Sequence, residues 1–261
     1  MSEYVLSQRD SPDLERARLR LLEDYHDPLS VGQLDAIGVG EGWRCLDVGA
    51  GGGSVTRMLA QRVGNAGSVL AVDLDTSLLD DLGSDRVEVR RLDVMSDQLP
   101  QAAFDLVHAR LLLMFLSPRL SALQRLVRAA RPGGWVVPTA PDFSTVRLSP
   151  TNQVWQRVWS QFLDAGMAGG WDPGYGARLL DDLHAAGLVD VHADYITRRY
   201  PGGSLPARLI SMTVERLRER MVALGADRGE IDAAQRLLEA PAITVTSPTT
   251  CMARGRRPRL D

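Results

Sequence analysis

The chain has 261 residues, of which 44% are hydrophobic and 24% are charged, and its formal net charge is −3 at pH 7. This length and composition are typical of a globular protein with one sizeable core, and the slightly acidic balance argues against a nucleic-acid partner, which usually meets a basic face. Two cysteines, Cys45 and Cys251, are too few for a disulfide framework or a cysteine metal cluster, and each falls in an expected buried strand.

The N-terminal 40 residues are expected to form a helical lid. Charged and apolar residues after Pro12 follow a helical pattern, which Pro28 is expected to break because proline lacks the N–H that a helix interior needs. A second, short helix is then expected up to Ile37.

From Arg44 onwards the pattern changes to alternating strands and helices, which predicts a parallel sheet with crossover helices. The expected strands are 44–48, 68–73, 87–92, 104–109 and 134–139, and the expected helices are 54–63, 76–82 and 118–130.

Beyond Pro141 this alternation is interrupted. The expected helices are 151–163, a second one that ends at 186, 205–224 and 230–238. The expected strands are 188–197 and 243–254. We therefore expect one domain over residues 1–261, with a core at 41–143, helical cap insertions at 144–186 and 201–240, and closing strands within 187–200 and 241–257.

A buried strand leads into a glycine-rich turn at Leu46–Ser54 (LDVGAGGGS), and this turn opens a helix. Glycines let the backbone turn tightly and let a ligand approach closely. A dinucleotide fingerprint would place Gly or Ala where Ser54 stands. The carboxylate of Asp47 would repel a pyrophosphate but would attract a cationic sulfonium or ammonium group.

Further acids close the next two expected strands. Asp73 ends the second strand, where a carboxylate can accept hydrogen bonds from two ribose hydroxyls. Asp93 ends the third, where it could accept a hydrogen bond from an adenine amine. Ligands of open α/β sheets bind at this carboxyl edge.

These segments, together with Phe104–Arg110 and Arg131–Gly134, resemble the class I S-adenosylmethionine-dependent methyltransferases, and most closely the ubiquinone/menaquinone-methyltransferase-like branch, many of whose members act on natural products. The resemblance implies an α/β, Rossmann-like seven-stranded sheet of order 3-2-1-4-5-7-6 with strand 7 antiparallel. It implies S-adenosylmethionine (SAM) as the cofactor. The implied cofactor contacts are Asp47, Gly49, Ala50, Gly51, Asp73, Leu74, Asp93, Val94, Ala109 and Arg110.

The acceptor is expected to be a small molecule. Methyltransferases of amino groups in DNA and protein often carry an Asn-Pro-Pro-Tyr-type motif after the fourth strand, where this chain has Arg110 followed by three leucines. That departure disfavours a base-amine or glutamine-amide acceptor.

Three residues are candidates for a catalytic base. His108 on the fourth strand is either a core histidine or a base near the methyl group. Asp142, which follows the fifth strand, is a base, a substrate anchor or a plain loop acid. Tyr175 lies with Trp171 in a Gly/Pro-rich loop and either lines the acceptor pocket or packs in a core. Tyr4 is either a lid residue that contacts the cofactor or a surface tyrosine.

The sequence indicates no metal site, because the histidines lack metal-ligand spacing. No apolar run reaches the roughly 18 residues of a membrane span, and the first ten residues lack a signal-peptide pattern. We therefore expect a cytoplasmic protein without membrane association, and the sequence gives no indication of its oligomeric state.

Three alternatives to methyl transfer stay open. The chain could bind SAM and catalyse a rearrangement or cyclisation, it could be a scaffold that keeps the fold, or it could be a nicotinamide dehydrogenase. The intact acids and glycine loop speak against the scaffold, and Ser54 and Asp47 speak against the dehydrogenase.

Overall fold

The computed structural model describes residues 12–259, and these form two compact units. Of the described residues, the sheet unit comprises His26–Ala140, Ala177–Asp194 and 251–259. The helical unit comprises 12–25, Pro141–Gly176 and Tyr195–Thr250. Each unit is described by itself below.

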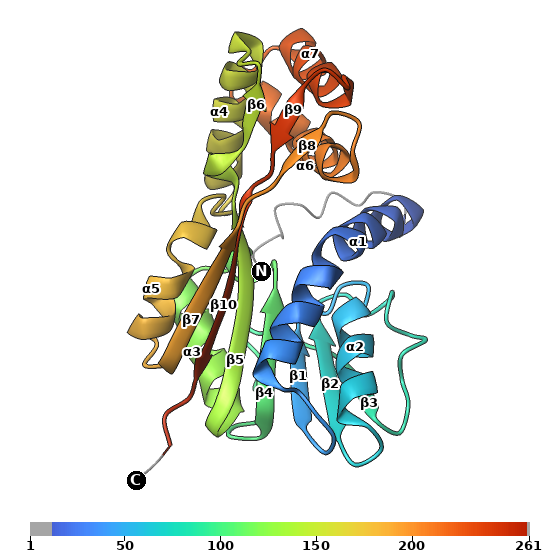
Figure 1. The fold of residues 1–261 in the computed structure, drawn as a ribbon, viewed down its shortest axis with the longest axis vertical. Helices are drawn as coiled ribbons and strands as arrows, with labels where there is room; N and C mark the ends of the chain where they lie inside the picture. Colours follow the sequence, from blue (N-terminus) through green and yellow to red (C-terminus); the bar gives the residue numbers. More distant parts are fainter. Residues whose placement is uncertain (1–11, 260–261) are drawn as a thin grey trace. The chain divides into compact units, whose positions relative to one another are not determined.

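The sheet unit is built on a seven-stranded sheet of order β3-β2-β1-β4-β5-β10-β7 (Figure 1). Its strands are β1 (Arg44–Val48), β2 (Ser68–Asp73), β3 (Val87–Arg91), β4 (Phe104–Arg110), β5 (Ala130–Asp142), β7 (Val189–Ile196) and β10 (Thr249–Arg256). Since β7 and β10 are the expected sixth and seventh strands, this is the predicted order 3-2-1-4-5-7-6.

Strands β1 to β5 are parallel to one another, and β10 is antiparallel to β5. Parallel registers join β1 to β2 and β4, β2 to β3, and β4 to β5. At the start of β5, Gly133 donates to the carbonyl of Arg257 while Arg257 donates to Gly134, the reciprocal exchange of an antiparallel pair. The predicted Rossmann-like, seven-stranded mixed sheet is therefore confirmed.

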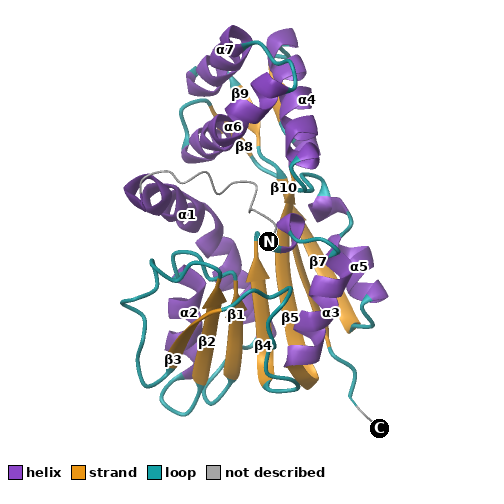
Figure 2. Ribbon diagram, turned by 180° about the vertical axis from the view of Figure 1, so that it is seen from behind, coloured by secondary structure: helices purple, strands orange, loops and turns teal. Residues whose placement is uncertain are grey.

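Helices cover both faces of this sheet (Figure 2). The helices are α1 (Pro12–Ile37), α2 (Ser54–Val63), α3 (Arg119–Ala129) and α5 (Leu179–Ala185), and a short 3-10 turn, η1 (Leu113–Phe115), follows β4. The C-terminal part of α1 lies with α2 on one face, and α3 and α5 lie on the other.

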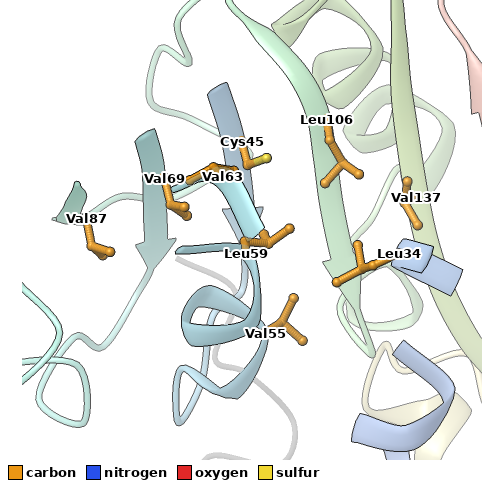
Figure 3. Packing of buried hydrophobic residues seen from close by; sticks show 9 residues of the cluster. All are labelled: Leu34, Cys45, Val55, Leu59, Val63, Val69, Val87, Leu106 and Val137. Carbon is orange, nitrogen blue, oxygen red and sulfur yellow. The ribbon is translucent and has the colours of Figure 1, made fainter. Parts of the chain in front are cut away.

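An apolar layer joins the sheet to α1 and α2 (Figure 3). Its buried members are Leu34, Cys45, Val55, Leu59, Val63, Val69, Val87, Leu106 and Val137. Burying each valine or leucine of this kind contributes about 1.5–3 kcal/mol, so the layer holds the sheet rigid beneath its carboxyl edge. Cys45 and Cys251 are both buried, free thiols, as expected.

The helical unit combines three helices with a small sheet. The helices are α4 (Gln153–Ala168), α6 (Leu205–Ala223) and α7 (Arg228–Glu239). The strands β6 (Arg147–Ser149), β8 (Arg199–Pro201) and β9 (Thr244–Thr246) form an antiparallel sheet of order β6-β9-β8. Aromatic rings fill its interior: Trp159 stacks on Trp155 at 4.9 Å and on Phe162 at 4.6 Å between ring centroids.

The expected helix at 76–82 is absent, and that prediction is wrong. Successive turns replace it, since Leu79 donates to the carbonyl of Thr76 and Leu82 donates to that of Leu79. The carboxylate of Asp75 accepts from the Ser77 N–H and so offers the backbone a local partner that competes with a helix.

The expected break at Pro28 is also wrong, because α1 runs unbroken from Pro12 to Ile37 with Pro28 inside it. A proline removes one N–H donor, and tertiary contacts beyond it can offset that loss. Here Leu34 packs in the apolar layer and the Gln33 side chain donates to the carbonyl of Ala253 at 3.0 Å.

The expected closing strand at 243–254 is two strands. Ser247 and Pro248 separate β9, which pairs with β6 and β8, from β10, which belongs to the seven-stranded sheet. Pro248 has no N–H for a strand ladder. Strands β6 and β8 are additions to the predicted set. In the part of the chain that the structure describes, no helix has the length and apolar character to cross a membrane.

Candidate functional site

The glycine loop between β1 and α2 bends through left-handed backbone conformations. Gly49, Gly51 and Gly53 have φ angles of 72°, 58° and 82°, a region that residues with a Cβ rarely adopt. The loop is anchored to the second strand, because the N–H of Gly49 donates to the carbonyl of Val72 at 2.8 Å. This anchoring leaves a fixed concave backbone at the carboxyl edge of the sheet.

Asp73, at the end of β2, closes against this loop. Its Oδ2 accepts from the N–H of Gly51 at 2.9 Å and its Oδ1 accepts from the N–H of Asp75 at 3.1 Å. Burial raises the pKa of Asp73, and the backbone N–H donors only partly offset this effect. The two residues that the sequence predicted as cofactor contacts here are therefore in direct contact with each other.

Asp93 lies at the same edge, because the N–H of Leu92 donates to the carbonyl of Asp73 at 2.8 Å. Its Oδ1 accepts from the N–H of Met95 at 2.8 Å, which fixes the carboxylate at the head of a turn. The neighbouring Val94 is buried, whereas Leu74 has half of its side chain exposed.

Asp47 lies beneath the glycine loop and has both carboxylate oxygens in use. Oδ2 accepts from Oγ1 of Thr56 at 2.7 Å, and Oδ1 lies 2.9 Å from Nδ1 of His108. Burial acts to raise the pKa of Asp47, but the bonds from His108 and Thr56, with the charge of Arg110, lower it overall. Since Asp47 is only 2% exposed, it presents no free carboxylate face to a ligand.

His108 is held by this bond and keeps one nitrogen unused. Its Nε2 is buried and finds no hydrogen-bond partner within residues 12–259, and the same holds for Oγ1 of Thr139. Both residues point to the α1/α2 face, because the parallel register pairs His108 with Asp47 and Val137, and Thr139 lies two residues after Val137. The unused nitrogen is the side of His108 on which chemistry can occur.

Arg110, at the end of β4, links three segments of the sheet unit. Its guanidinium donates to Oδ1 of Asp27 at 2.8 Å, to Oγ of Ser30 at 3.1 Å and to Oγ of Ser54 at 3.0 Å. The preceding Ala109 is buried. Asp27, Ser30 and Thr56 were not predicted from the sequence, since their partners lie between 9 and 83 residues away and no motif spacing connects them.

Two of the remaining candidates belong to the helical unit. Asp142 belongs to the helical unit, where its Oδ1 accepts from both the N–H and the hydroxyl of Ser144 and caps a 3-10 turn, η2 (Phe143–Thr145). Tyr175, in η3 (Tyr175–Ala177), also belongs to that unit and is 1% exposed. Tyr4 lies outside the described residues.

The structure thus brings the glycine loop, Asp73, Asp93, Asp47, His108 and Arg110 together at the carboxyl edge of one sheet. Within the described part of the chain, no group of three or more His, Cys, Asp or Glu residues could hold a metal ion. The carboxylates at this edge are hydrogen-bond acceptors, which hydroxyl and amine groups of a ligand can meet.

The chain is similar to known methyltransferases. Residues 46–137 match the methyltransferase domain family. The chain is 31% identical over 143 residues to a ubiquinone biosynthesis O-methyltransferase of Paracidovorax citrulli, which covers 51% of this chain and 56% of that protein. It is 28% identical over 197 residues to methyltransferase str2 of Strobilurus tenacellus, covering 72% of this chain and 68% of that protein.

The fold is also shared with a solved structure. Haemonchus contortus phosphoethanolamine N-methyltransferase 2, in complex with S-adenosyl-L-methionine, is 16% identical, with a TM-score of 0.53 over 99% of this chain and 56% of that one. The chain spans about half the length of the ubiquinone-biosynthesis relative.

Proposed function

We propose, from the match of residues 46–137 to the methyltransferase domain family and from the order of the sheet, that the chain is a class I S-adenosylmethionine-dependent methyltransferase that transfers a methyl group to an O, N or C nucleophile of a small-molecule acceptor. The observation that carries this proposal is the contact between Asp73 and the glycine loop, at 2.9 Å from Oδ2 to the N–H of Gly51.

The residues at this edge fit a nucleoside with a charged sulfonium group. A carboxylate has about four acceptor positions, so Asp73 can bind two ribose hydroxyls while it keeps its bonds to Gly51 and Asp75. Oδ1 of Asp93 accepts from the N–H of Met95, and we assign the adenine amine to its other oxygen. Leu74 supplies an exposed apolar surface beside Asp73 for the adenine ring.

Asp47 would act on the cofactor without direct contact. Both of its oxygens are used by Thr56 and His108, so its negative charge reaches a bound sulfonium only through the field at the end of β1. Gly49, Ala50 and Gly51 would meet the ligand through their backbone, as would Ala109 and Arg110 at the end of β4.

SAM supplies an electrophilic methyl group, and the chain has to orient the acceptor, exclude water and accept a proton where one is released. His108 is the candidate base that the site supports best, because Asp47 holds Nδ1 and leaves Nε2 to accept a proton. Asp142 and Tyr175 are the remaining candidates, and both belong to the helical unit.

Two observations support a small-molecule acceptor. A relative is a ubiquinone biosynthesis O-methyltransferase, and the net charge of −3 does not favour a polyanionic partner. We assign selection of the acceptor to the insertions at 144–186 and 201–240, acting with the N-terminal helix as a cap, and we place the reaction in natural-product biosynthesis.

Titration calorimetry of the purified chain with SAM, S-adenosylhomocysteine (SAH) and NAD tests the cofactor. We expect heat with the first two and none with NAD. Incubation with SAM and a panel of quinols, phenols and amines, followed by mass spectrometry, is expected to yield SAH and an acceptor 14 Da heavier. Absence of heat with both SAM and SAH would overturn the proposal, and product without added mass would indicate a rearrangement or cyclisation.

A further inference from the structure

We infer that Arg110 and Asp27 form a clamp on Ser54 that presets the glycine loop for the cofactor. The inference rests on the proposed function and adds positioning residues to it. The role assigned to the Arg110 side chain is new, because the family resemblance implies only a backbone contact at that position.

The clamp is a closed set of hydrogen bonds. Arg110 donates to Asp27 at 2.8 Å and to Ser54 at 3.0 Å, and Ser54 in turn donates to the same Asp27 oxygen at 2.8 Å. A third bond, from Arg110 to Ser30 at 3.1 Å, ties the guanidinium to the next turn of α1. The planar guanidinium fork fixes direction as well as distance.

Ser54 is the point at which this clamp can act on the loop. It is the first residue of α2 and directly follows Gly53, whose φ is 82° and which gives the helix no side-chain cap. The other side of the loop is held by the N–H of Gly49 on the carbonyl of Val72 and by the N–H of Gly51 on the carboxylate of Asp73. The guanidinium of Arg57 also donates to the carbonyl of Gly52 at 2.9 Å. The clamp adds a part-buried side-chain restraint on Ser54, where the loop enters α2.

The surroundings make the ion pair stronger than an exposed one. The side chains of Arg110 and Asp27 are 12% and 27% exposed, so water screens them weakly. The neighbouring His26 adds no second positive charge beside Arg110, since burial and the charge of Arg110 lower the pKa of His26 to about 3 and keep its imidazole neutral. Asp27 is thus the acid that balances Arg110 in the clamp.

A matched control exists on the same two helices. Arg62 near the end of α2 donates to Asp35 near the end of α1 at 2.8 Å, and Asp35 is 63% exposed. This pair joins α1 to α2 at the end of α2 that is remote from the glycine loop. Its loss removes a link between the two helices without touching Ser54, whereas the Arg110–Asp27 pair joins β4 to α1 and contacts Ser54.

The test measures SAH affinity by calorimetry on the full chain. Arg110→Gln and Asp27→Asn are each expected to weaken SAH binding about tenfold, and the double variant should be no weaker than either single one because the bonds form one unit. The SAH affinity of Arg110→Lys should lie between those of the wild type and Arg110→Gln, since lysine keeps the charge but lacks the planar guanidinium fork. Arg62→Gln should stay within about twofold of the wild type.

Amide hydrogen exchange of the ligand-free chain separates this inference from the proposed function. We expect faster exchange at Gly51–Ser54 in Arg110→Gln and unchanged exchange in Arg62→Gln. If Arg110→Gln does not fold, Ser54→Ala keeps the Arg110–Asp27 pair and should show the same faster exchange. A wild-type chain that binds no SAH would overturn the proposed function. Normal exchange at the loop, or wild-type SAH affinity in folded clamp variants, would overturn the clamp.

Discussion

Asp47 and His108 stand opposite each other on β1 and β4, and the register of the two parallel strands pairs them directly. Oδ1 of Asp47 lies 2.9 Å from Nδ1 of His108, and both side chains are almost completely buried. The pair therefore fixes the orientation of the imidazole and turns Nε2 away from β1. The buried carboxylate of Asp47 is held by two donors, Thr56 and His108. We therefore expect the end of β1 to be destabilised when Asp47 loses its charge.

Asp47→Asn is expected to lower the free energy of unfolding at pH 7 by about 2 kcal/mol, the cost of losing charge-assisted bonds in a buried place. Because the pKa of Asp47 is lowered in the folded chain, its contribution is present above the unfolded pKa and is lost as pH falls through the folded one. Urea unfolding followed by circular dichroism, at several pH values, should show a shallower acid dependence for the variant.

The control for this prediction is Asp81→Asn, which removes an exposed carboxylate that pairs with Arg57 at 3.4 Å. It should change stability by less than about 0.5 kcal/mol. Equal stability of Asp47→Asn and the wild type at pH 7 would show that the network with Thr56 and His108 contributes nothing.

Asp73→Asn is expected to weaken SAH binding about a hundredfold, because two hydroxyl donors lose a charged acceptor. Burial raises the pKa of Asp73, so its carboxylate takes up a proton at a higher pH than an ordinary aspartate. SAH affinity of the wild type should therefore fall on acidification while the carboxylates with ordinary pKa values are still ionised. Calorimetry across the acidic range should show this fall, and the variant should lack it.

Gly53→Ala is expected to lower stability by about 2 kcal/mol and also to weaken SAH binding. The alanine would have to keep the φ of 82° that Gly53 has. Its Cβ would overlap Leu82 and would lie 3.0 Å from Cδ2 of the buried Leu79. Gly38→Ala is the matched control, since its φ is 77° and nothing lies within 4 Å of the added Cβ.

Gly38→Ala should therefore cost only the backbone strain, about 1 kcal/mol, and should leave SAH affinity unchanged. Thermal unfolding and calorimetry on the two variants measure both effects. If the two alanine variants bound SAH equally well, the shape of the glycine loop would not govern cofactor binding.

Glu15 predicts an acid-sensitive contact in the helical unit. Burial acts to raise its pKa, but bonds to Arg18 and Arg216 at 2.6 and 2.5 Å lower it to about 2. The resulting stabilisation is present above the unfolded pKa of about 4.5 and is lost as pH falls towards 2. Glu15→Gln should cost about 1–2 kcal/mol at pH 6 after allowance for partial exposure.

The difference between Glu15→Gln and the wild type should shrink steadily between pH 4.5 and pH 2 in urea unfolding. Glu230→Gln removes a pair between Glu230 and the more exposed Arg157, at 2.6 Å in the same unit, and serves as the control. A Glu15 variant whose deficit is the same at pH 6 and pH 2 would contradict the assignment.

Most of the sheet could be predicted because its signals are local. Three strand-like segments carry Asp47, Asp73 and Asp93 at or near their carboxyl ends, with a glycine loop after the first, and these are sufficient to predict parallel strands with acids at one edge. The helix at 76–82 failed because an Asx turn at Asp75 competes with helix formation over so short a segment. The break at Pro28 failed because contacts of Gln33 and Leu34, distant in sequence, hold the helix together.

The candidate site was predictable only where a motif carries it. The contact of Asp73 with Gly51 joins two motif residues, whereas the clamp joins Arg110 to Asp27, 83 residues away on a helix with no marker of its own. Thr56 occupies an ordinary helical position, and only the fold shows that it lies against Asp47. Long-range polar pairing of this kind is set by tertiary packing, which residue spacing does not encode.

The chain passes from one unit to the other five times, after Tyr25, Ala140, Gly176, Asp194 and Thr250. Neither unit is therefore a continuous stretch that can be cloned as a fragment. A protease cut inside 141–176 or 195–250 would leave the pieces of each unit joined only by noncovalent packing. A graft of the helical unit from a relative would have to exchange both of these segments together with the part of α1 up to Tyr25, with junctions at all five places.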